Sequence, residues 1–262
     1  MTVLMHLSDL HFGAHDPVVC AAVQRLAQRL GVAMVVVSGD LTQRATAEQF
    51  EQAARFVQGL HARSSLVLAG NHDLPLFAWW MRWGRSYERF SEQFGLDQEP
   101  VRQMGAFYVV GVNTTRAWRH ERGSLSSAQI EHVALLLARA PPGAWRIVAS
   151  HDPLVAGDAE DRDHRPHRAD EAVERWRIAG AQMLLSGHVH QPRLLQPLPG
   201  LWASSAGTAV SHRLRHGSPN SLVVLSTEAS GDALDGQARV AARWDYDGAV
   251  GEFVCVDRVN AG

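Results

Sequence analysis

Short apolar runs alternate along this chain with polar segments in which hydrophobic residues recur at helical spacing. The runs are mostly aliphatic or β-branched and are bounded by Ser, Gly or Asn. Continuous apolar runs of this length are typical of strands that are buried on both faces. Their alternation with helical segments predicts an α/β fold. The clearest runs are 3–5, 34–37, 66–68, 147–149 and 183–185.

The segments between the runs carry signals for helix ends. Asp16 can cap a helix that begins with Pro17, and two Ser/Thr-x-x-Gln sequences have the spacing of a capping box. Glycine is the usual residue just past a helix end. The expected helices therefore begin at Pro17, after Thr46, after Ser126 and at Asp170, and three of them end near Gly31, Gly59 and Gly180.

The last quarter of the chain changes character. Segments near 201–210, 221–226, 238–245 and 250–257 look like short strands that are separated by Gly, Pro, Asn and Asp. Over 200–257 we expect the strands of a second sheet that packs against the first. Because no long linker, repeat or low-complexity tract interrupts the chain, residues 1–262 are expected to form a single domain.

Polar side chains that can bind metals follow almost every apolar run. In sheets that alternate with helices, ligands gather beyond the carboxyl ends of the strands, so we expect these side chains to meet. Any one of them has an ordinary explanation, such as a helix cap, a turn or a buried histidine. Their joint placement at strand ends favours a two-metal hydrolase site. The residues are Asp9, His11, Asp40, Asn71, His72, Asp73, His151, His188 and His190.

The kind and spacing of these side chains restrict the metal. Asp9 and His11 are two residues apart, as are His188 and His190, so in an extended chain each pair would point the same way. The set offers oxygen and imidazole but no thiolate, which favours hard or borderline ions over a structural zinc of the cysteine type. Mn²⁺, iron and Zn²⁺ all remain admissible.

Composition excludes some classes of function. The chain has 262 residues, 46% of them hydrophobic and 20% charged, with a formal net charge of -2. This charge gives no general attraction to nucleic acid or to an anionic membrane. No apolar run approaches the roughly 20 residues that span a bilayer, and no secretory leader is evident. The cysteines, outside any CxxC spacing, are expected to be reduced, and we expect a cytoplasmic protein.

The ordered motifs resemble those of the calcineurin-like metallophosphoesterase superfamily. They run from Asp9-x-His11 through Gly39-Asp40, the 70–73 sequence Gly-Asn-His-Asp and His151 to Gly187-His188-x-His190. The resemblance covers 9–190 in the family's order. It implies a four-layer αββα sandwich, in which helices flank two mixed β-sheets, with a dinuclear site in the loops at one end.

The resemblance also assigns roles, position by position. A first metal would be held by Asp9, His11 and His190, a second by Asn71, His151 and His188, with Asp40 bridging both. His72 would lie near the scissile phosphate, protonated to assist the leaving group, and Asp73 would orient its imidazole. Two cations about 3.5–4 Å apart would neutralise the phosphate and activate a bridging hydroxide for in-line attack.

Within the superfamily, residues 8–13, 39–42 and 187–190 are most similar to the class III cyclic nucleotide phosphodiesterase and glycerophosphodiesterase branch. This implies hydrolysis of a small phosphate ester such as a 3',5'-cyclic nucleotide or a glycerophosphodiester. The chain departs from the branch beside His151, where Ser150 and Asp152 replace a second histidine. The alternative is a pyrophosphatase or phosphatase for a nucleotide-sugar or lipid-linked substrate, with a nuclease or a non-catalytic scaffold less favoured.

Other residues are candidates for substrate contact. The aromatic segment 74–104, with Trp79 and Trp80, either caps the substrate or packs against helices or a second copy in a homodimer. The polar segment 157–168 is either a lid or a solvated loop. Its candidate phosphate contacts are Arg162, Arg165 and Arg168. Asn113 follows an expected strand at 107–112, and turn formation explains it equally well. For the basic group His212, Arg213, Arg215 and His216, surface solvation is the simpler interpretation.

Overall fold

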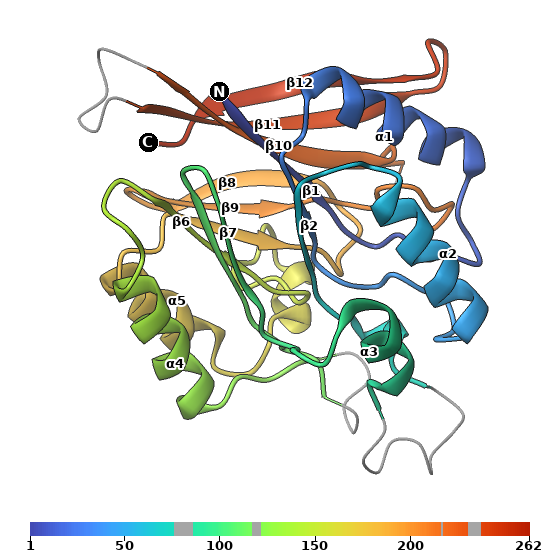
Figure 1. Ribbon diagram of the computed structural model, residues 1–262. Helices are drawn as coiled ribbons and strands as arrows, with labels where there is room; N and C mark the ends of the chain where they lie inside the picture. Colours follow the sequence, from blue (N-terminus) through green and yellow to red (C-terminus); the bar gives the residue numbers. More distant parts are fainter. Residues whose placement is uncertain (76–85, 117–121, 216, 230–236) are drawn as a thin grey trace.

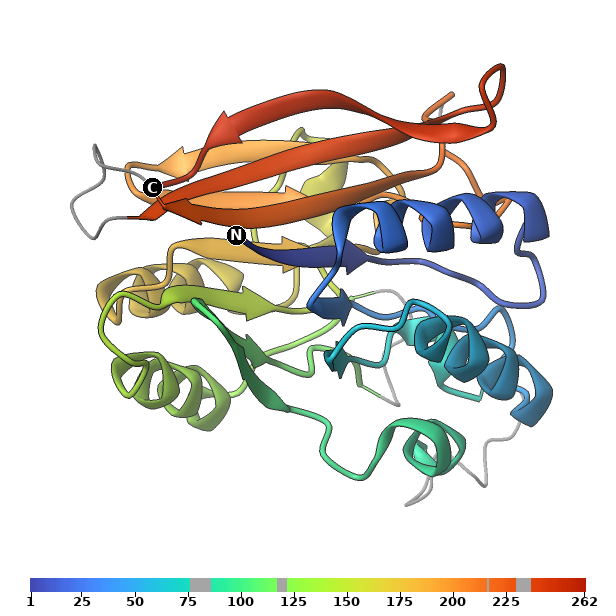
Figure 2. The same cartoon turned by 45° about the horizontal axis from the view of Figure 1, so that its top comes forward.

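The protein folds into two six-stranded mixed sheets that lie face to face with helices outside them (Figures 1 and 2). The computed structural model describes residues 1–75, 86–116, 122–215, 217–229 and 237–262. This is the four-layer αββα sandwich that the motifs imply. None of the helices in the described ranges is long and apolar enough to cross a membrane.

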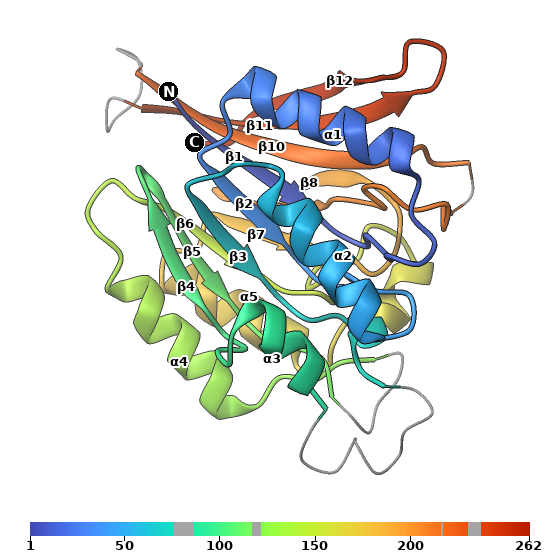
Figure 3. The ribbon, with the colours of Figure 1, turned by 45° about the vertical axis from the view of Figure 1, so that its right-hand side comes forward.

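The first sheet has the order β12-β11-β10-β1-β2-β3. Its parallel half is β1 (Thr2–Leu7), β2 (Met34–Val37) and β3 (Ser64–Val67). Its antiparallel half is β10 (Ser221–Ala229), β11 (Gln237–Asp247) and β12 (Glu252–Asn260). The helices on its outer side are α1 (Pro17–Leu30), α2 (Ala47–Gln58) and the short α3 (Glu88–Phe94), which packs beside α2 (Figure 3).

The second sheet has the order β4-β5-β6-β7-β9-β8. Its parallel strands are β5 (Phe107–Gly111), β6 (Trp145–Ala149), β7 (Met183–Ser186) and β9 (Leu201–Ser205). Its antiparallel edges are β4 (Val101–Met104) and β8 (Arg193–Leu198). The helices α4 (Ser127–Ala138) and α5 (Ala169–Ile178) cover its outer face.

Three apolar layers hold the sandwich together, one between the sheets and one under each set of helices. Residues of β2 alternate between them: Met34 and Val36 face the other sheet, whereas Val35 and Val37 face the helices. Because side chains alternate along a strand, a strand buried on both faces must be apolar throughout. This explains the continuous apolar runs in the sequence.

Helix ends follow the local signals closely. Asp16 accepts a hydrogen bond from the backbone N–H of Val18 at the start of α1, and Gly31 ends that helix in the left-handed conformation. Ser126 and Gln129 form the expected capping box of α4. Helix α5 begins at Ala169, one residue earlier than Asp170 predicts, after Arg168 with φ 69°.

The C-terminal strands do not form a sheet of their own, contrary to the expectation for 200–257. Strand β9 joins the second sheet, whereas β10 to β12 extend the first. The reason is that β10 pairs antiparallel with β1 and so covers its open edge. Both cysteines are free, and Cys20 is half-buried in α1 while Cys255 is exposed on β12.

Candidate metal centre

The side chains that follow the parallel strands meet at one end of the sandwich. Asp9 and His11 come after β1, Asp40 after β2 and Asn71 after β3. From the other sheet, His151 comes after β6, and His188 and His190 after β7. The structure therefore brings together all the ligands that the sequence predicts, from both sheets.

The backbone at these positions is unusual. Asp9, His11, Asp40, His188 and His190 all have positive φ, between 44° and 68°. Non-glycine residues seldom adopt this conformation, and it recurs at functional sites. The extended geometry that the two-residue spacing suggests is therefore wrong. The ligands lie in tight loops, and His188 and His190 face different groups of ligands.

The first group contains Asp9, His11, Asp40 and His190, whose ligand atoms all lie within 4.8 Å of one another. Nε2 of His190 is 3.1 Å from Nε2 of His11 and 3.1 Å from Oδ1 of Asp9. Nε2 of His11 is 3.6 Å from Oδ2 of Asp40. Ligand atoms about 2.1 Å from a shared ion lie roughly 3.0–3.4 Å apart, so this spacing suits one cation.

The second group surrounds the amide oxygen of Asn71. This Oδ1 atom is 3.0 Å from Nε2 of His151 and 3.1 Å from Nδ1 of His188. Nε2 of His151 is in turn 3.4 Å from Oδ1 of Asp40. The two carboxylate oxygens of Asp40 thus face different groups, as a bridging ligand requires.

Hydrogen bonds behind the two groups point lone pairs into them. Nδ1 of His190 donates to the carbonyl oxygen of Arg213 at 2.7 Å, and Nδ1 of His151 donates to that of Ser38 at 3.0 Å. When these two imidazoles are neutral, their Nε2 lone pairs face carboxylate and amide oxygens, which also carry lone pairs. Asp9 Oδ1 is buried and makes no hydrogen bond within the described part of the chain. Such converging acceptors fit cations.

Burial and mutual charge also shift the acidities in the centre. Burial, together with Asp9 and Asp73, raises the pKa of Asp40 to about 7. Burial works against ionisation of Asp9, yet the neighbouring His190 lowers its pKa well below the usual range. Burial also disfavours the charged form of His151, but Asp40 and Asp9 outweigh it and raise its pKa to about 9. Protons and cations therefore compete for the same atoms.

Two glycines make room for these carboxylates. A Cβ atom at Gly70 would collide with Oδ1 and the backbone nitrogen of Asp40. A Cβ atom at Gly187 would collide with Ser8 and with Oδ2 of Asp9. Gly70 and Gly187 are thus explained by their close approach to carboxylates of the candidate metal centre.

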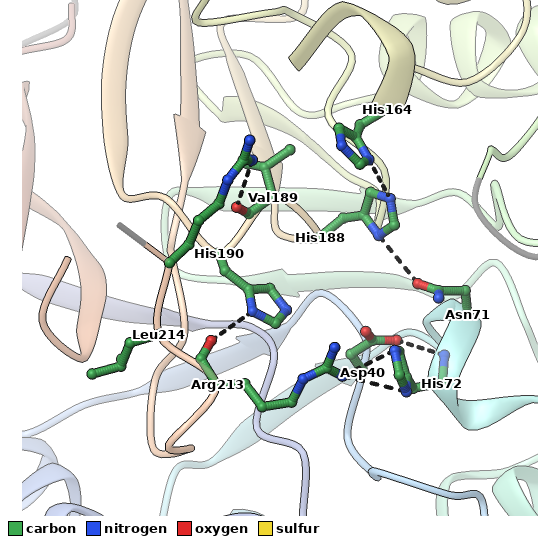
Figure 4. Close-up of a pocket in the computed structure, with 10 residues that line it drawn as sticks. Asp40, Asn71, His72, His164, His188, Val189, His190, Arg213 and Leu214 are labelled. Atoms are coloured by element: carbon green, nitrogen blue, oxygen red, sulfur yellow. Dashed lines mark hydrogen bonds between the residues drawn. The ribbon is translucent and has the colours of Figure 1, made fainter. Parts of the chain in front are cut away.

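A pocket of about 680 Å³ opens above the centre (Figure 4). Eight of its ten lining residues are polar or charged, and two of these are arginines that could attract an anion. Its floor is formed by ligands of both groups. The lining residues are Asp40, Asn71, His72, His164, His188, Val189, His190, Arg213, Leu214 and Arg215.

The surroundings of His72 and Asp73 differ from those that the resemblance to the family implies. The Asp73 carboxylate accepts hydrogen bonds from the backbone N–H groups of Gly70, Leu41 and Thr42, so it shapes the loops and does not orient His72. The His72 ring is oriented by the carbonyl oxygen of Gln43, 3.2 Å from its Nδ1. Burial and the positive charge of Arg213 lower the pKa of His72 to about 4, although the hydrogen bond to Gln43 acts in the opposite direction. A neutral His72 is the form that this environment favours.

Several other candidates lie outside the centre. Arg165 pairs with Asp170, and Arg168 pairs with Glu171, while Arg162 lines a separate pocket beside α5. The Asn113 side chain bonds with Tyr87 and Thr115. Trp79 and Trp80 fall outside the described residues. Substrate contact by these residues stays a prediction, and the structure does not bring the described ones into the pocket.

Asp152, which stands beside His151, has a structural role. It is buried and accepts hydrogen bonds from the hydroxyl of Thr114 and the backbone N–H of Gly123. It therefore ties two loops together beneath the site instead of facing the substrate.

His164 and Arg213 line the pocket, although neither of them was assigned a role in the site from the sequence. Nδ1 of His164, in the short helix Glu160–His164, is 3.2 Å from Nε2 of His188. Arg213 is in the loop between β9 and β10, and its NH1 group is 3.0 Å from Nε2 of His72. The histidine lies in a segment considered as a lid. The arginine belongs to the basic group for which surface solvation is the simpler interpretation, and this interpretation is wrong for Arg213 and Arg215, which line the pocket.

The sequence matches the family model of the calcineurin-like phosphoesterases over residues 2–192. The chain belongs to this family, whose members are metal-dependent phosphoesterases, and the Asp and His cluster fits a metal site of that class. A comparison with curated proteins finds no significant match.

Solved structures share the fold. A purple acid phosphatase from yellow lupin (Lupinus luteus) seeds has a TM-score of 0.72 and 14% sequence identity. The match covers 99% of this chain and 53% of the phosphatase chain. The chain thus spans about half the length of that phosphatase. A dimetal phosphatase from Danio rerio has a TM-score of 0.67 and 10% identity, covering 100% and 99%. Vps29 from Entamoeba histolytica, as a single mutant, has a TM-score of 0.51 and 16% identity, covering 100% of both chains.

Proposed function

We propose that the protein is a metal-dependent phosphodiesterase for a small substrate such as a 3',5'-cyclic nucleotide or a glycerophosphodiester. The observation that carries the proposal is Asp40, whose two oxygens face two groups of ligand atoms at the floor of the pocket. The pocket's volume of about 680 Å³ is in the range of small-molecule sites. The similarity of residues 8–13, 39–42 and 187–190 to the phosphodiesterase branch supports a diester substrate.

The residues present would divide the work as follows. Asp9, His11 and His190 would hold one cation and Asn71, His151 and His188 the other, with Asp40 shared. When bound, two such cations neutralise the phosphate and lower the pKa of a water molecule. The carbonyl groups of Ser38 and Arg213 hold the His151 and His190 rings in place. Oxygen and imidazole donors make Mn, Fe and Zn the metals to test.

Hydrolysis of bis-p-nitrophenyl phosphate and of p-nitrophenyl phosphate by Mn²⁺-loaded protein tests this proposal. We expect a higher kcat/KM for the diester, loss of activity with a chelator, and turnover of at least one cyclic nucleotide or glycerophosphodiester. A preference for the monoester, or no turnover by protein that holds two ions, would reject the phosphodiesterase.

A phosphatase or pyrophosphatase is the second candidate. The lupin and Danio rerio neighbours are both named phosphatases, although at 14% and 10% identity they show the fold alone. Of the aromatic segment 74–104 that would cap a nucleotide-sugar or lipid-linked substrate, residues 76–85, with Trp79 and Trp80, lie outside the described residues. Phe90 is buried in the apolar layer under α1 and α2, and Tyr87 and Phe94 pack against that layer. This candidate predicts cleavage of the monoester or of pyrophosphate. The homodimer and the cytoplasmic location stay predictions from the sequence.

A further inference from the structure

Arg213, in the loop between β9 and β10, contacts the site at two points, one through its backbone and one through its side chain. Its carbonyl oxygen accepts the hydrogen bond from His190, while its guanidinium group extends across the pocket towards His72 (Figure 4). The hydroxyl of Thr208 also donates to this carbonyl at 3.2 Å, and the N–H of Arg213 donates to the hydroxyl of Ser211 at 2.9 Å. The arginine is therefore held in place by buried partners.

The guanidinium group contacts imidazole and amide side chains. Its NH1 nitrogen lies 3.0 Å from Nε2 of His72, 3.4 Å from Oε1 of Gln43 and 3.5 Å from Nδ1 of His11. Within the described ranges, no carboxylate forms an ion pair with it. Two nearby arginines differ, because Arg215 pairs with Glu160 at 2.8 Å and Arg193 pairs with Asp158.

The contact with His72 fixes the direction of the hydrogen bond. A guanidinium group can only donate, so Nε2 of His72 must accept. The ring proton then lies on Nδ1, which faces the carbonyl oxygen of Gln43 at 3.2 Å. In this arrangement His72 offers no proton to the pocket through Nε2, and its ring supports the arginine.

From this geometry we infer that Arg213 binds the phosphate anion of the substrate, and that His72 and Gln43 position its guanidinium group. The inference rests on the proposed function, since it concerns the same pocket. A half-buried cation beside a centre loaded with metal ions would be repelled by them, and an anion bound between them would offset that repulsion. The planar fork of an arginine is also suited to two phosphate oxygens at once.

The test compares inorganic phosphate binding to Mn²⁺-loaded wild type and Arg213→Gln by calorimetry, with metal content measured on the same samples. Each charge-assisted hydrogen bond that is lost weakens binding by roughly 10- to 100-fold, so we expect a dissociation constant larger by about that factor. Metal content should stay equal, because the carbonyl oxygen that holds His190 is retained. Arg213→Lys should fall between the two.

Arg102→Gln is the matched control, because it removes the same charge from an exposed position on the edge strand β4. It should bind phosphate like wild type. The inference would be overturned if metal-loaded Arg213→Gln bound phosphate as tightly as wild type. It would also be overturned if the weaker phosphate binding of Arg213→Gln were fully explained by a loss of metal. Wild type that prefers a monoester would reject the phosphodiesterase alone, because the phosphate comparison does not depend on it.

Discussion

At the scale of the residue, the centre depends on Asp40. Its Oδ1 accepts a hydrogen bond of 2.8 Å from the backbone N–H of His72, which fixes the orientation of the carboxylate. Its backbone has φ 51°, and Gly70 leaves the space that it occupies. The two oxygens then face two different groups of ligands. One side chain can therefore link both metal positions.

His72→Ala should leave metal content unchanged while slowing turnover. The ring lies beside the ligands without belonging to either group, and its loss removes the support of Arg213. A misplaced binding group costs on the order of 10²-fold in kcat/KM. Inductively coupled plasma mass spectrometry and steady-state kinetics measure the two effects. His72→Gln, which keeps a neutral acceptor, should retain more activity than alanine, and equal metal loss in His72→Ala and Asp40→Asn would contradict this role.

Residue types were predictable at this scale, whereas side-chain directions were not. An Asp, an Asn or a His directly after a buried strand marks a candidate ligand, because the fold brings strand ends together. The positive φ values of Asp9, His11 and His188 depend on the surrounding loops and leave no local signal. The same holds for Asp73, whose carboxylate binds backbone N–H groups of another loop.

At the scale of the element, the short helix Glu160–His164 brings a histidine to the metal centre. Arg193 on β8 pairs with Asp158 just before this helix and with Asp161 within it, and Arg215 pairs with Glu160. The pairs with the exposed Asp158 and Glu160 contribute little stability singly, yet together with the buried Asp161 they fix the position of one segment.

Arg193→Ala should loosen residues 157–164 with little effect on global stability. The change removes one partner of Asp158 and of Asp161, while Asp161 keeps Arg215 at 3.7 Å and the N–H of Gly157, and the apolar layers stay intact. Hydrogen exchange measured by mass spectrometry should show faster exchange in this segment alone. Arg177→Ala is the control, because its partner Glu174 lies within α5. Equal exchange in the two variants would show that Arg193 does not hold the segment.

Helix boundaries were the most predictable elements because capping is local. Asp16, Thr46 and Ser126 cap the helices that their sequences indicate. The start of α5 was predicted one residue late, since the non-glycine residue before it, Arg168, has a left-handed conformation that the sequence does not reveal.

At the scale of the whole molecule, the sheets join distant parts of the chain. Strand β10 pairs with β1 from the opposite end of the sequence, and β9 inserts between β7 and β8. The strands themselves were predictable from apolar runs and turn residues. Their distribution between two sheets was not, because an apolar pattern shows which faces are buried and not which strand is the neighbour.

Acid should destabilise the metal-free protein partly through His6. Burial, only partly opposed by Asp9, lowers the pKa of His6 from 6.5 to about 3. Between pH 6.5 and 3, His6 is protonated in the unfolded chain but neutral in the folded protein. The free energy of unfolding therefore has its full value above pH 6.5 and decreases as the pH drops toward 3. The loss is about 1.4 kcal/mol per pH unit.

Urea denaturation with a chelator at several pH values between 7.5 and 4 measures this effect. Against His6→Gln, which keeps a polar partner for Ser38, the wild type should lose stability more steeply as pH falls. Parallel curves for the two proteins would show that His6 does not titrate in this range.

The central claim is that one carboxylate joins two metal positions, and metal stoichiometry of wild type and Asp40→Asn tests it most directly. Wild type reconstituted with Mn²⁺ and freed of excess metal should hold two ions per chain, and Asp40→Asn should lose occupancy at both positions together, because each group loses the same charged ligand. Wild type that holds a single ion, or a variant that loses only one of two, would contradict the shared centre.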